Sequence, residues 1–304
     1  MSMTTRLAQA LPLPPAGQEI IENPERIPAL TRDTFTSTRR LSALPHLFQH
    51  RSDFDAVERY CMFIGHGRTG HSLVGSLLNG HDKMVVSHEL DAFQLLDRAV
   101  VPVTRNQLFS AVLQRDAEFT GLGREWTRYS YDVPGTDQGE FDTLRVIGDK
   151  KGAASTRRLG TSPELLGELR ETVSVPIRVI HVVRNPFDTI ASRRKRKETW
   201  KEYGVEKYFA NADHVELVEE MLDDDELFRM SHEDLIDDTA GVMSDLCSFL
   251  GVEASEAYLS ACDEFVFDSP TQTREEFEWS DEEIERIERK SQAYEWLSRY
   301  AFDE

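Results

Sequence analysis

The chain has 304 residues, of which 39% are hydrophobic, and this is enough for one large α/β domain or two small ones. A formal net charge of −20 argues against nucleic acid as a partner for the protein as a whole. No apolar run approaches the roughly 20 residues of a membrane helix, and the N-terminus lacks a signal-peptide pattern, so a cytoplasmic location is expected. Arginine far outnumbers lysine, which a salt-rich cytoplasm or a codon bias would both explain.

Residues 1–40 are rich in proline, threonine and arginine and have weak periodicity. We predict an extended or partly ordered arm there. No linker or internal repeat interrupts residues 41–304, which we predict to form a single α/β domain. Its three cysteines are far apart and lie in apolar contexts, which favours core thiols over a disulfide or zinc site.

A glycine-rich turn joins the first predicted strand, residues 60–64, to a helix that ends near Asn79. Backbone N–H groups converge at such a helix start, so the turn predicts a phosphate or sulfate site. Three templates fit it. Gly65, Gly67 and Gly70 match a dinucleotide fingerprint with Glu89 as its acid, while Gly70-His71-Ser72 matches a P-loop with histidine in the lysine position. The third template is a strand followed by Arg68-Thr69-Gly70-His71-Ser72, which resembles the 5′-phosphosulfate loop of sulfotransferases.

Two further short strands are predicted at residues 84–86 and 144–147. His88 and Glu89 follow the first of them, and Lys150 follows the second. Because strand carboxyl ends meet at one edge of an open α/β sheet, these side chains are expected near the glycine turn. Between the two strands lies an aromatic segment, residues 126–131, for which surface packing is favoured over an acceptor pocket.

The clearest strand, residues 177–183, runs into Arg184, Asn185 and Pro186, which predict the cap and first position of a helix. Arg184 and Ser192 form a second candidate phosphate site, which implies a ligand with phosphates at two ends. The basic residues 193–197 are interpreted as a solvated helix face that balances the acidic run 213–226. Helices are also predicted at 163–171, with Thr161 or Ser162 as cap, at 239–250 and from Ser280 to about residue 296.

Strands alternating with helices predict a doubly wound parallel sheet, a three-layer α/β/α fold of the P-loop NTPase-like kind. Residues 63–73 and 179–193 look like the two nucleotide motifs of the sulfotransferase family, and the resemblance extends over residues 60–250. Residues 148–150, 231–235 and 246–251 are similar to three further segments of that family and follow in the same order. The family differs from this chain at His71, where it has serine or threonine, and at Lys151-Gly152, where it has Thr-Pro.

The resemblance implies 3′-phosphoadenosine 5′-phosphosulfate (PAPS) as donor and 3′-phosphoadenosine 5′-phosphate (PAP) as product, with no metal. It assigns the 3′-phosphate to Arg184 and Ser192. It assigns the 5′-phosphosulfate to residues of the loop, namely Gly67, Arg68, Thr69, Gly70, His71 and Ser72.

Sulfuryl transfer is expected to proceed in line, with Arg68 and Lys150 stabilising the charge that develops. The acceptor hydroxyl needs a base, for which Glu89 is the first choice and His88 the second. A glycan, glycolipid or small alcohol is the expected acceptor. A P-loop kinase, a dinucleotide oxidoreductase and a non-catalytic nucleotide-binding module remain as alternatives.

Overall fold

The fold is described here from a computed structural model over residues 43–97, 102–126, 129–196, 199–267 and 269–303. The predicted arm at residues 1–40 lies outside the described residues. Within them, no helix combines the length and hydropathy that a membrane span requires.

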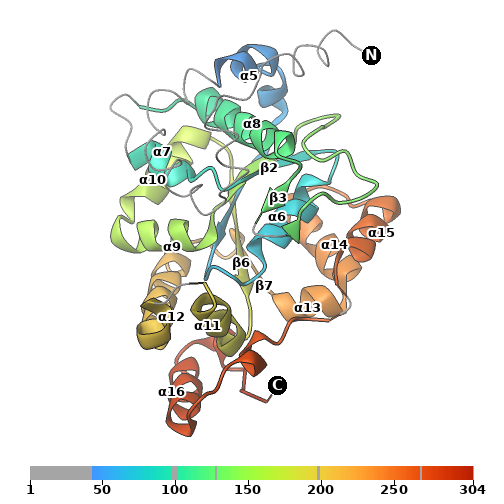
Figure 1. Cartoon of the computed structure of the whole chain (residues 1–304). Coiled ribbons are helices and arrows are strands. Elements are labelled where there is room, and N and C mark those ends of the chain that lie inside the picture. Colours follow the sequence, from blue (N-terminus) through green and yellow to red (C-terminus); the bar gives the residue numbers. More distant parts are fainter. Residues whose placement is uncertain (1–42, 98–101, 127–128, 197–198, 268, 304) are drawn as a thin grey trace.

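A five-stranded parallel sheet forms the centre of the molecule (Figure 1), with strand order β2-β5-β1-β6-β7. Its strands are β1 (Arg59–Ile64), β2 (Met84–His88), β5 (Val146–Lys150), β6 (Ile177–Val183) and β7 (Leu227–Ser231). Two short strands, β3 (Glu125–Trp126) and β4 (Tyr129–Ser130), pair antiparallel outside this sheet. The chain is therefore an α/β protein with a central parallel sheet, as predicted.

Side chains of the central strands alternate between two cores, one on each face of the sheet. On β1, Tyr60, Met62 and Ile64 belong to one core, whereas Cys61 and Phe63 belong to the other. Because both faces are covered, the strands are almost continuously apolar rather than alternately polar. All three cysteines are buried and unpaired in the second core, which confirms that they are core thiols.

Helices cover both faces of the sheet and complete the three layers (Figure 1). The first core packs beneath α7 (Ala92–Asp97), α8 (Arg105–Gly121), α9 (Gly152–Thr161), α10 (Glu164–Val173), α11 (Pro186–Arg194), α12 (Thr199–Glu219) and α16 (Asp281–Ser291), with the short turns α5 (Leu44–Gln49), η2 (Asp53–Ala56) and η4 (Glu295–Leu297) beside it. The second packs beneath α6 (His71–Asn79), α13 (His232–Asp237), α14 (Thr239–Leu250) and α15 (Glu256–Phe265). A 3-10 turn, η3 (Thr273–Glu276), leads from α15 towards α16.

Several predicted helix ends are confirmed. The Asn185 side chain accepts a hydrogen bond from the Phe187 N–H, and Pro186 begins α11. Gly251 ends α14 in the left-handed conformation, and Ser280 caps α16 through the Glu283 N–H.

Other element predictions were wrong. The third strand is β5, which begins at Val146 and extends to Lys150, so that Lys150 is a strand residue rather than a loop residue. Helix α9 was not predicted because the two glycines at 148 and 152 were interpreted as a loop, and β7 was missed because an acidic run precedes it. Helix α10 has Pro163 at its cap position without a side-chain cap, and α16 ends at Ser291.

Gly148 allows β5 and β1 to lie close together. A Cβ atom at this position would stand 2.2 Å from the Cys61 carbonyl oxygen and 2.4 Å from its Sγ. Gly148→Ala is expected to lower the free energy of unfolding by about 1–3 kcal/mol, because two strands of a packed sheet would have to separate. Denaturant titration of the full chain measures this change.

Gly167→Ala is the matched control, because Gly167 lies in α10 and a Cβ atom added there would meet nothing within 4 Å. It is expected to leave stability unchanged or raise it by up to about 1 kcal/mol through helix propensity. Equal effects of the two substitutions would contradict the close approach of β5 and β1.

Candidate functional site

A cavity of about 680 Å³ opens at the carboxyl edge of the sheet. Its walls come from the glycine loop, the ends of β2 and β5, the start of α9, the end of α11 and the aromatic segment after α8. Phe265, Phe267 and Thr271 close it on the side of α13 and α15. The edge at which the sequence places the ligand site therefore contains a cavity large enough for a nucleotide-sized molecule.

The loop between β1 and α6 has a conformation that depends on three positive φ angles, at Gly65, Arg68 and Gly70. Gly70 is the N-cap of α6 at φ 100°, and a Cβ there would lie 2.6 Å from Nδ1 of His232. Arg68 has φ 82°, which is unusual for a residue with a side chain and is typical of functional loops. Its Nε donates to Ser192 Oγ at 2.9 Å, which ties the loop to α11.

Two loop side chains turn inwards instead of into the cavity. Thr69 Oγ1 donates to the His66 carbonyl at 2.8 Å, and Nε2 of His71 lies 2.8 Å from the Ile64 carbonyl. Because a carbonyl only accepts, Nε2 of His71 carries the proton. Burial lowers the pKa of His71 to about 3, so its ring is neutral and hydrogen-bonds the end of β1.

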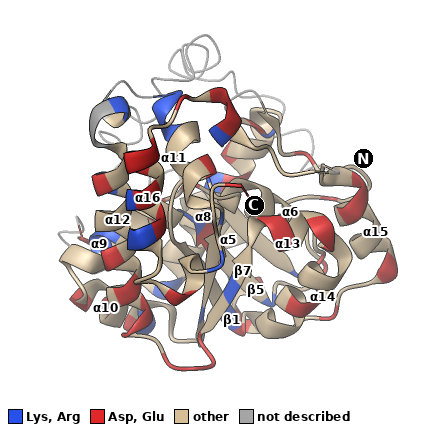
Figure 2. Cartoon of the chain, turned by 90° about the horizontal axis from the view of Figure 1, so that it is seen from below, with Lys and Arg blue, Asp and Glu red and all other residues tan. Residues whose placement is uncertain are grey.

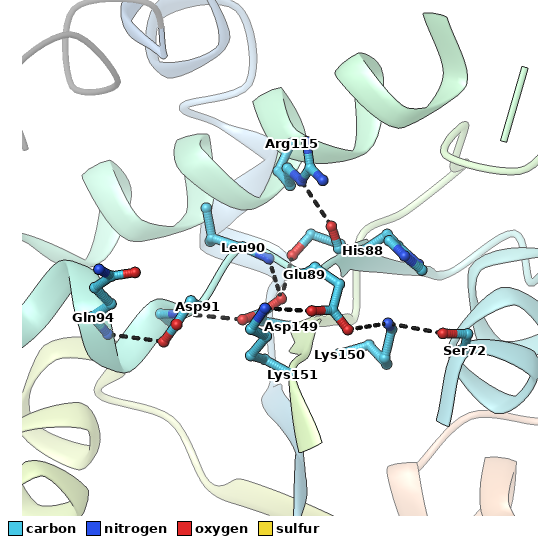
Figure 3. A network of polar contacts seen from close by, with 12 residues as sticks. Ser72, His88, Glu89, Leu90, Asp91, Gln94, Arg115, Asp149, Lys150 and Lys151 are labelled. Atoms are coloured by element: carbon cyan, nitrogen blue, oxygen red, sulfur yellow. Dashed lines mark hydrogen bonds and ion pairs between the residues drawn. The ribbon is translucent and has the colours of Figure 1, made fainter. Parts of the chain in front are cut away.

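Glu89 lies between two lysines at the ends of the central strands (Figure 3). Nζ of Lys150 is 2.7 Å from Glu89 Oε1 and 3.0 Å from Ser72 Oγ, and Nζ of Lys151 contacts Glu89 Oε2. The Lys150 stem fits because Gly75 of α6 has no side chain, since a Cβ there would stand 2.9 Å from Lys150 Cγ. These contacts join the glycine loop to β2 and β5.

The same ion pairs determine the protonation of Glu89. Burial alone would raise the pKa of this carboxyl, but Lys150 and Lys151 outweigh burial and hold the pKa of Glu89 well below its usual range. Burial lowers the pKa of Lys150 despite its acidic partner, whereas in Lys151 the attraction of Glu89 exceeds the effect of burial and raises the pKa. Glu89 is therefore a carboxylate at neutral pH.

Asp149 holds the turn that presents Glu89. Its carboxylate accepts hydrogen bonds from the Leu90 N–H at 2.8 Å, the Ala92 N–H at 3.1 Å and Ser87 Oγ at 3.0 Å. Glu89 itself has φ 63°, a left-handed conformation that these bonds stabilise. Asp149 is a positioning residue that the sequence analysis did not identify.

His88 points away from the cavity. Its ring stacks on Phe119 at 4.2 Å and meets Trp126 at 5.2 Å, and the ring does not line the cavity that Glu89 lines. Burial, followed by the positive charge of Lys150, lowers its pKa well below the usual value. The structure thus separates the two candidate bases, with Glu89 at the cavity and His88 beneath the aromatic segment.

Arg184 connects three segments at the other end of the cavity. Its guanidinium donates to the Arg68 carbonyl at 3.2 Å and also contacts the Thr271 carbonyl. Its buried Nε has no partner among the described residues, which leaves a donor free to bind an anion. Arg184 and Ser192 therefore both contact the glycine loop, although the sequence analysis expected two separate phosphate sites.

The cavity is strongly cationic although the protein is acidic. Acidic residues, red in Figure 2, are spread over the outer helices. By contrast, one described carboxylate, Glu89, lines the cavity together with seven cationic side chains, namely Arg68, Lys150, Lys151, Arg157, Arg184, Arg193 and Arg196. The structure records no salt bridge from any of the five arginines to a described carboxylate.

The basic residues 193–197 form only in part the solvated face that the sequence analysis favoured, because Lys195 and Arg196 are exposed whereas Arg194 is buried. Arg193 and Arg196 line the cavity, and burial, followed by the neighbouring arginines, lowers the pKa of Arg193 to about 10. Arg194 is buried against Glu283, and Lys195 pairs with Glu276, so neither pairs with the acidic run 213–226. Lys197 lies outside the described residues.

The aromatic segment after α8 also forms part of the wall. Trp126, Tyr129 and Tyr131 line the cavity, where surface packing had been favoured. Arg157 was missed together with α9, whose Ala153, Ala154 and Arg157 share one face at helical spacing. Had α9 been predicted, this spacing would have indicated a cavity-facing arginine.

The arrangement can bind an extended anion and position a hydroxyl beside it. Planar guanidinium groups and the backbone N–H groups at a helix N-terminus provide directed hydrogen-bond donors. A carboxylate lies beside two lysines. Such a site suits transfer of a charged group between two oxygens.

Comparisons with known proteins place these features in a family. A family model described as a sulfotransferase domain matches residues 153–304, the half of the chain that contains Arg184 and Ser192. The comparison with curated proteins found no significant match.

The comparison with solved structures matched several sulfotransferases at low identity. The sulfotransferase domain of the Synechococcus PCC 7002 olefin synthase is 18% identical over 67% of this chain and 77% of its own, with a TM-score of 0.46. Sulfotransferase STF9 from Mycobacterium avium is 12% identical over 94% of this chain and 87% of its own, with a TM-score of 0.49. A mouse sulfotransferase complexed with PAP is 13% identical over 76% and 72%, with a TM-score of 0.39. Family membership accordingly depends on the family model.

The buried histidines predict a pH dependence of stability. Burial lowers the pKa of both His66 and His71 to about 3, so the unfolded chain binds more protons than the folded chain between pH 3 and 6.5, and stability falls as pH decreases through this window. Asp149 acts in the opposite direction, because its raised pKa of about 6 lets the folded state bind the extra proton. Two histidines outweigh one aspartate, so the free energy of unfolding is expected to decrease from pH 7 to 5.5.

His71→Gln tests this, because an amide can still donate to the Ile64 carbonyl but does not titrate. The variant is expected to lose about 1 kcal/mol less than the parent protein between pH 7 and 5.5, measured by denaturant unfolding at both pH values. Equal losses of unfolding free energy in the parent protein and the variant would show that His71 does not contribute to the pH dependence of stability.

Proposed function

The chain belongs to the sulfotransferase domain family, whose model matches residues 153–304, and we propose that it transfers a sulfonate group from PAPS to the hydroxyl of a carbohydrate, glycolipid or small alcohol. The family assignment makes it a sulfonate-transferring enzyme. We propose the identity of the donor, the class of the acceptor and the roles of the individual residues.

The observation that carries the proposal is the pair of cationic positions that border one cavity. Arg184, whose buried Nε has no described partner, donates to the Arg68 carbonyl, and Ser192 accepts from the Arg68 side chain, whereas Lys150 contacts Ser72 and Glu89. PAPS has a phosphate on the 3′-oxygen and a phosphosulfate on the 5′-oxygen. Two groups of cations fit such a ligand better than the single phosphate chain of a nucleoside triphosphate.

We assign the 3′-phosphate to Arg184 and Ser192, and the 5′-phosphosulfate to Arg68, Ser72 and the N–H groups of the loop from Gly67 to His71. His71 and Thr69 contribute through this backbone, because their side chains point inwards. Lys150 would stabilise negative charge on the oxygen that bridges phosphorus and sulfur. No group of three histidine, cysteine or carboxylate side chains in the described part of the chain could hold a metal ion, and the proposal invokes none.

In the proposed reaction the acceptor oxygen forms a bond to sulfur while the bond from sulfur to the bridging oxygen breaks. The hydroxyl proton passes to Glu89, and PAP leaves with the bridging oxygen. The two lysines make Glu89 a weak base when they contact it, so the role requires that they turn towards the sulfonate. Loss of both cationic neighbours would raise the pKa of Glu89 at the moment when it has to accept a proton.

The P-loop kinase alternative is disfavoured by His71. In a P-loop, the residue at this position reaches the β- and γ-phosphates, whereas the His71 ring bonds the Ile64 carbonyl inside the fold. If the chain were a dinucleotide oxidoreductase, Arg184 would have no role in binding the dinucleotide. Neither alternative is supported by the family model.

PAP is expected to raise the melting temperature of the protein, whereas ATP with Mg²⁺ and NAD⁺ have little effect, because a ligand that binds only the folded state stabilises it. Arg184→Ala is expected to lower PAP affinity by about 10-fold or more, since a charge-assisted hydrogen bond contributes about 1.5–3 kcal/mol. Thermal-shift titration measures both effects.

Arg178→Ala is the matched control, because Arg178 lies at the other end of β6 and pairs with Asp225 away from the cavity. It should bind PAP like the parent protein. A shift with ATP and Mg²⁺ alone, or a PAP shift that survives Arg184→Ala, would contradict the proposed donor site.

Glu89→Gln is expected to reduce PAP formation from PAPS by about 100-fold or more, because the acceptor proton loses its base. PAP binding should be retained or strengthened, since the substitution removes the carboxylate that competes for Lys150 and Lys151. Glu58→Gln, at a carboxylate that pairs with Arg145, serves as control. Unchanged turnover in Glu89→Gln would remove Glu89 from the mechanism, and loss of turnover in His88→Phe alone would assign the base to His88.

A further inference from the structure

The cavity contains more cations than the proposed donor uses. The donor assignment employs Arg68, Lys150 and Arg184, together with the N–H groups of the loop. The cavity wall also carries Lys151, which the proposed reaction turns towards the sulfonate, and three cationic side chains without a role in that reaction, namely Arg157, Arg193 and Arg196, with Glu89 as the one described acidic residue on this wall.

These four side chains lie on two neighbouring elements. Lys151 and Arg157 flank the first turns of α9, and Arg193 and Arg196 lie at the end of α11. Arg193 reaches over the loop, where its Nε donates to the Gly67 carbonyl at 3.3 Å and its guanidinium lies 4.9 Å from the Trp200 ring. A Cβ atom at Gly67 would lie 2.2 Å from a guanidinium nitrogen of Arg193 and 3.7 Å from the Cβ of Ala153 in α9, so the loop brings Arg193 close to α9. Arg157 is also among the charges that lower the pKa of Arg193.

No described carboxylate neutralises the three arginines of this group. The structure records no salt bridge from Arg157, Arg193 or Arg196 to any described acidic residue, although the chain has a large excess of acids. Two of their neighbours on the surface, Arg158 and Lys195, do pair with carboxylates. Like charges that face one cavity in this way favour an anion in the space between them.

Small residues leave room for that anion. Ala153 and Ala154 occupy the face of α9 that leads from Lys151 to Arg157, and both line the cavity. The helix start has no side-chain cap, so its first N–H groups add to the positive field. On another wall, Trp126, Tyr129 and Phe267 offer aromatic surface to the ligand.

We infer that the acceptor is itself an anion: a hydroxyl compound that carries a carboxylate, sulfate or phosphate group beside a sugar ring or another apolar face. Its charged group binds between α9 and α11, at Arg157, Arg193 and Arg196. Its apolar face packs on the aromatic wall. This inference rests on the proposed function and narrows the acceptor class within it.

The test compares two ligands that differ at one carbon, p-nitrophenyl β-D-glucuronide and p-nitrophenyl β-D-glucoside. Each is titrated by calorimetry into the full-length protein saturated with PAP. The glucuronide is expected to bind about 10-fold or more tightly than the glucoside, because its carboxylate gains charge-assisted hydrogen bonds that a hydroxymethyl group lacks. The difference should shrink as salt is added.

Arg157→Ala and Arg196→Ala are each expected to reduce the preference for the glucuronide and to leave PAP affinity unchanged. Lys195→Ala is the matched control, because Lys195 is next to Arg196 in the chain but pairs with Glu276 and does not line the cavity. It should retain the full preference.

Equal affinity for the two ligands would overturn the inference. Failure of both ligands to bind would also overturn it. A preference that persists in the Arg157→Ala, Arg196→Ala double variant would overturn it as well. The first step separates this inference from the proposed function: if PAP does not bind, the donor proposal fails and the acceptor inference fails with it. If PAP binds and the preference is absent, only the acceptor inference fails.

Discussion

Repulsion between like charges at the carboxyl edge of the sheet is the constraint on which the site depends. Seven cationic side chains face one cavity with one described carboxylate, so their mutual repulsion is unfavourable and a bound anion relieves it. The surrounding fold has to provide the stability that offsets this cost. Two apolar cores, one on each face of the sheet, provide that stability and keep the ends of the strands in register.

Neutral and charged hydrogen bonds together hold the glycine loop. His71 bonds the Ile64 carbonyl, Thr69 bonds the His66 carbonyl, and Thr156 accepts from the Gly65 N–H at 2.8 Å. Arg184 donates to the Arg68 carbonyl, and Arg193 donates to the Gly67 carbonyl. The loop is therefore preorganised, and the Arg184 Nε remains available for a ligand.

The sequence was sufficient to predict four of the five strands of the central sheet and the edge at which the cavity opens, because glycine turns and apolar strands leave local signals. It was insufficient where contacts between distant parts of the chain determine which way a side chain points. Arg157 was missed because α9 begins at a glycine that is typical of a loop. Arg193 and Arg194 are adjacent in sequence, yet one lines the cavity and the other pairs with Glu283, a difference that only the packing of α16 creates. His88 and Glu89 separate for a similar reason, since Asp149 turns the backbone between them and α7.

The charge of the whole protein and the charge of the cavity have opposite signs. Which of the two dominates the force on a ligand depends on the distance between the ligand and the cavity. At about 0.1 M salt, charges act over a screening length of about 10 Å, so the net charge of −20 repels an approaching anion before the cavity attracts it. At about 1 M salt the screening length is about 3 Å, which removes the distant repulsion, while hydrogen bonds inside the cavity act at contact and persist. The architecture therefore separates the acidic outer surface from anion recognition, which the cationic side chains that line the cavity carry.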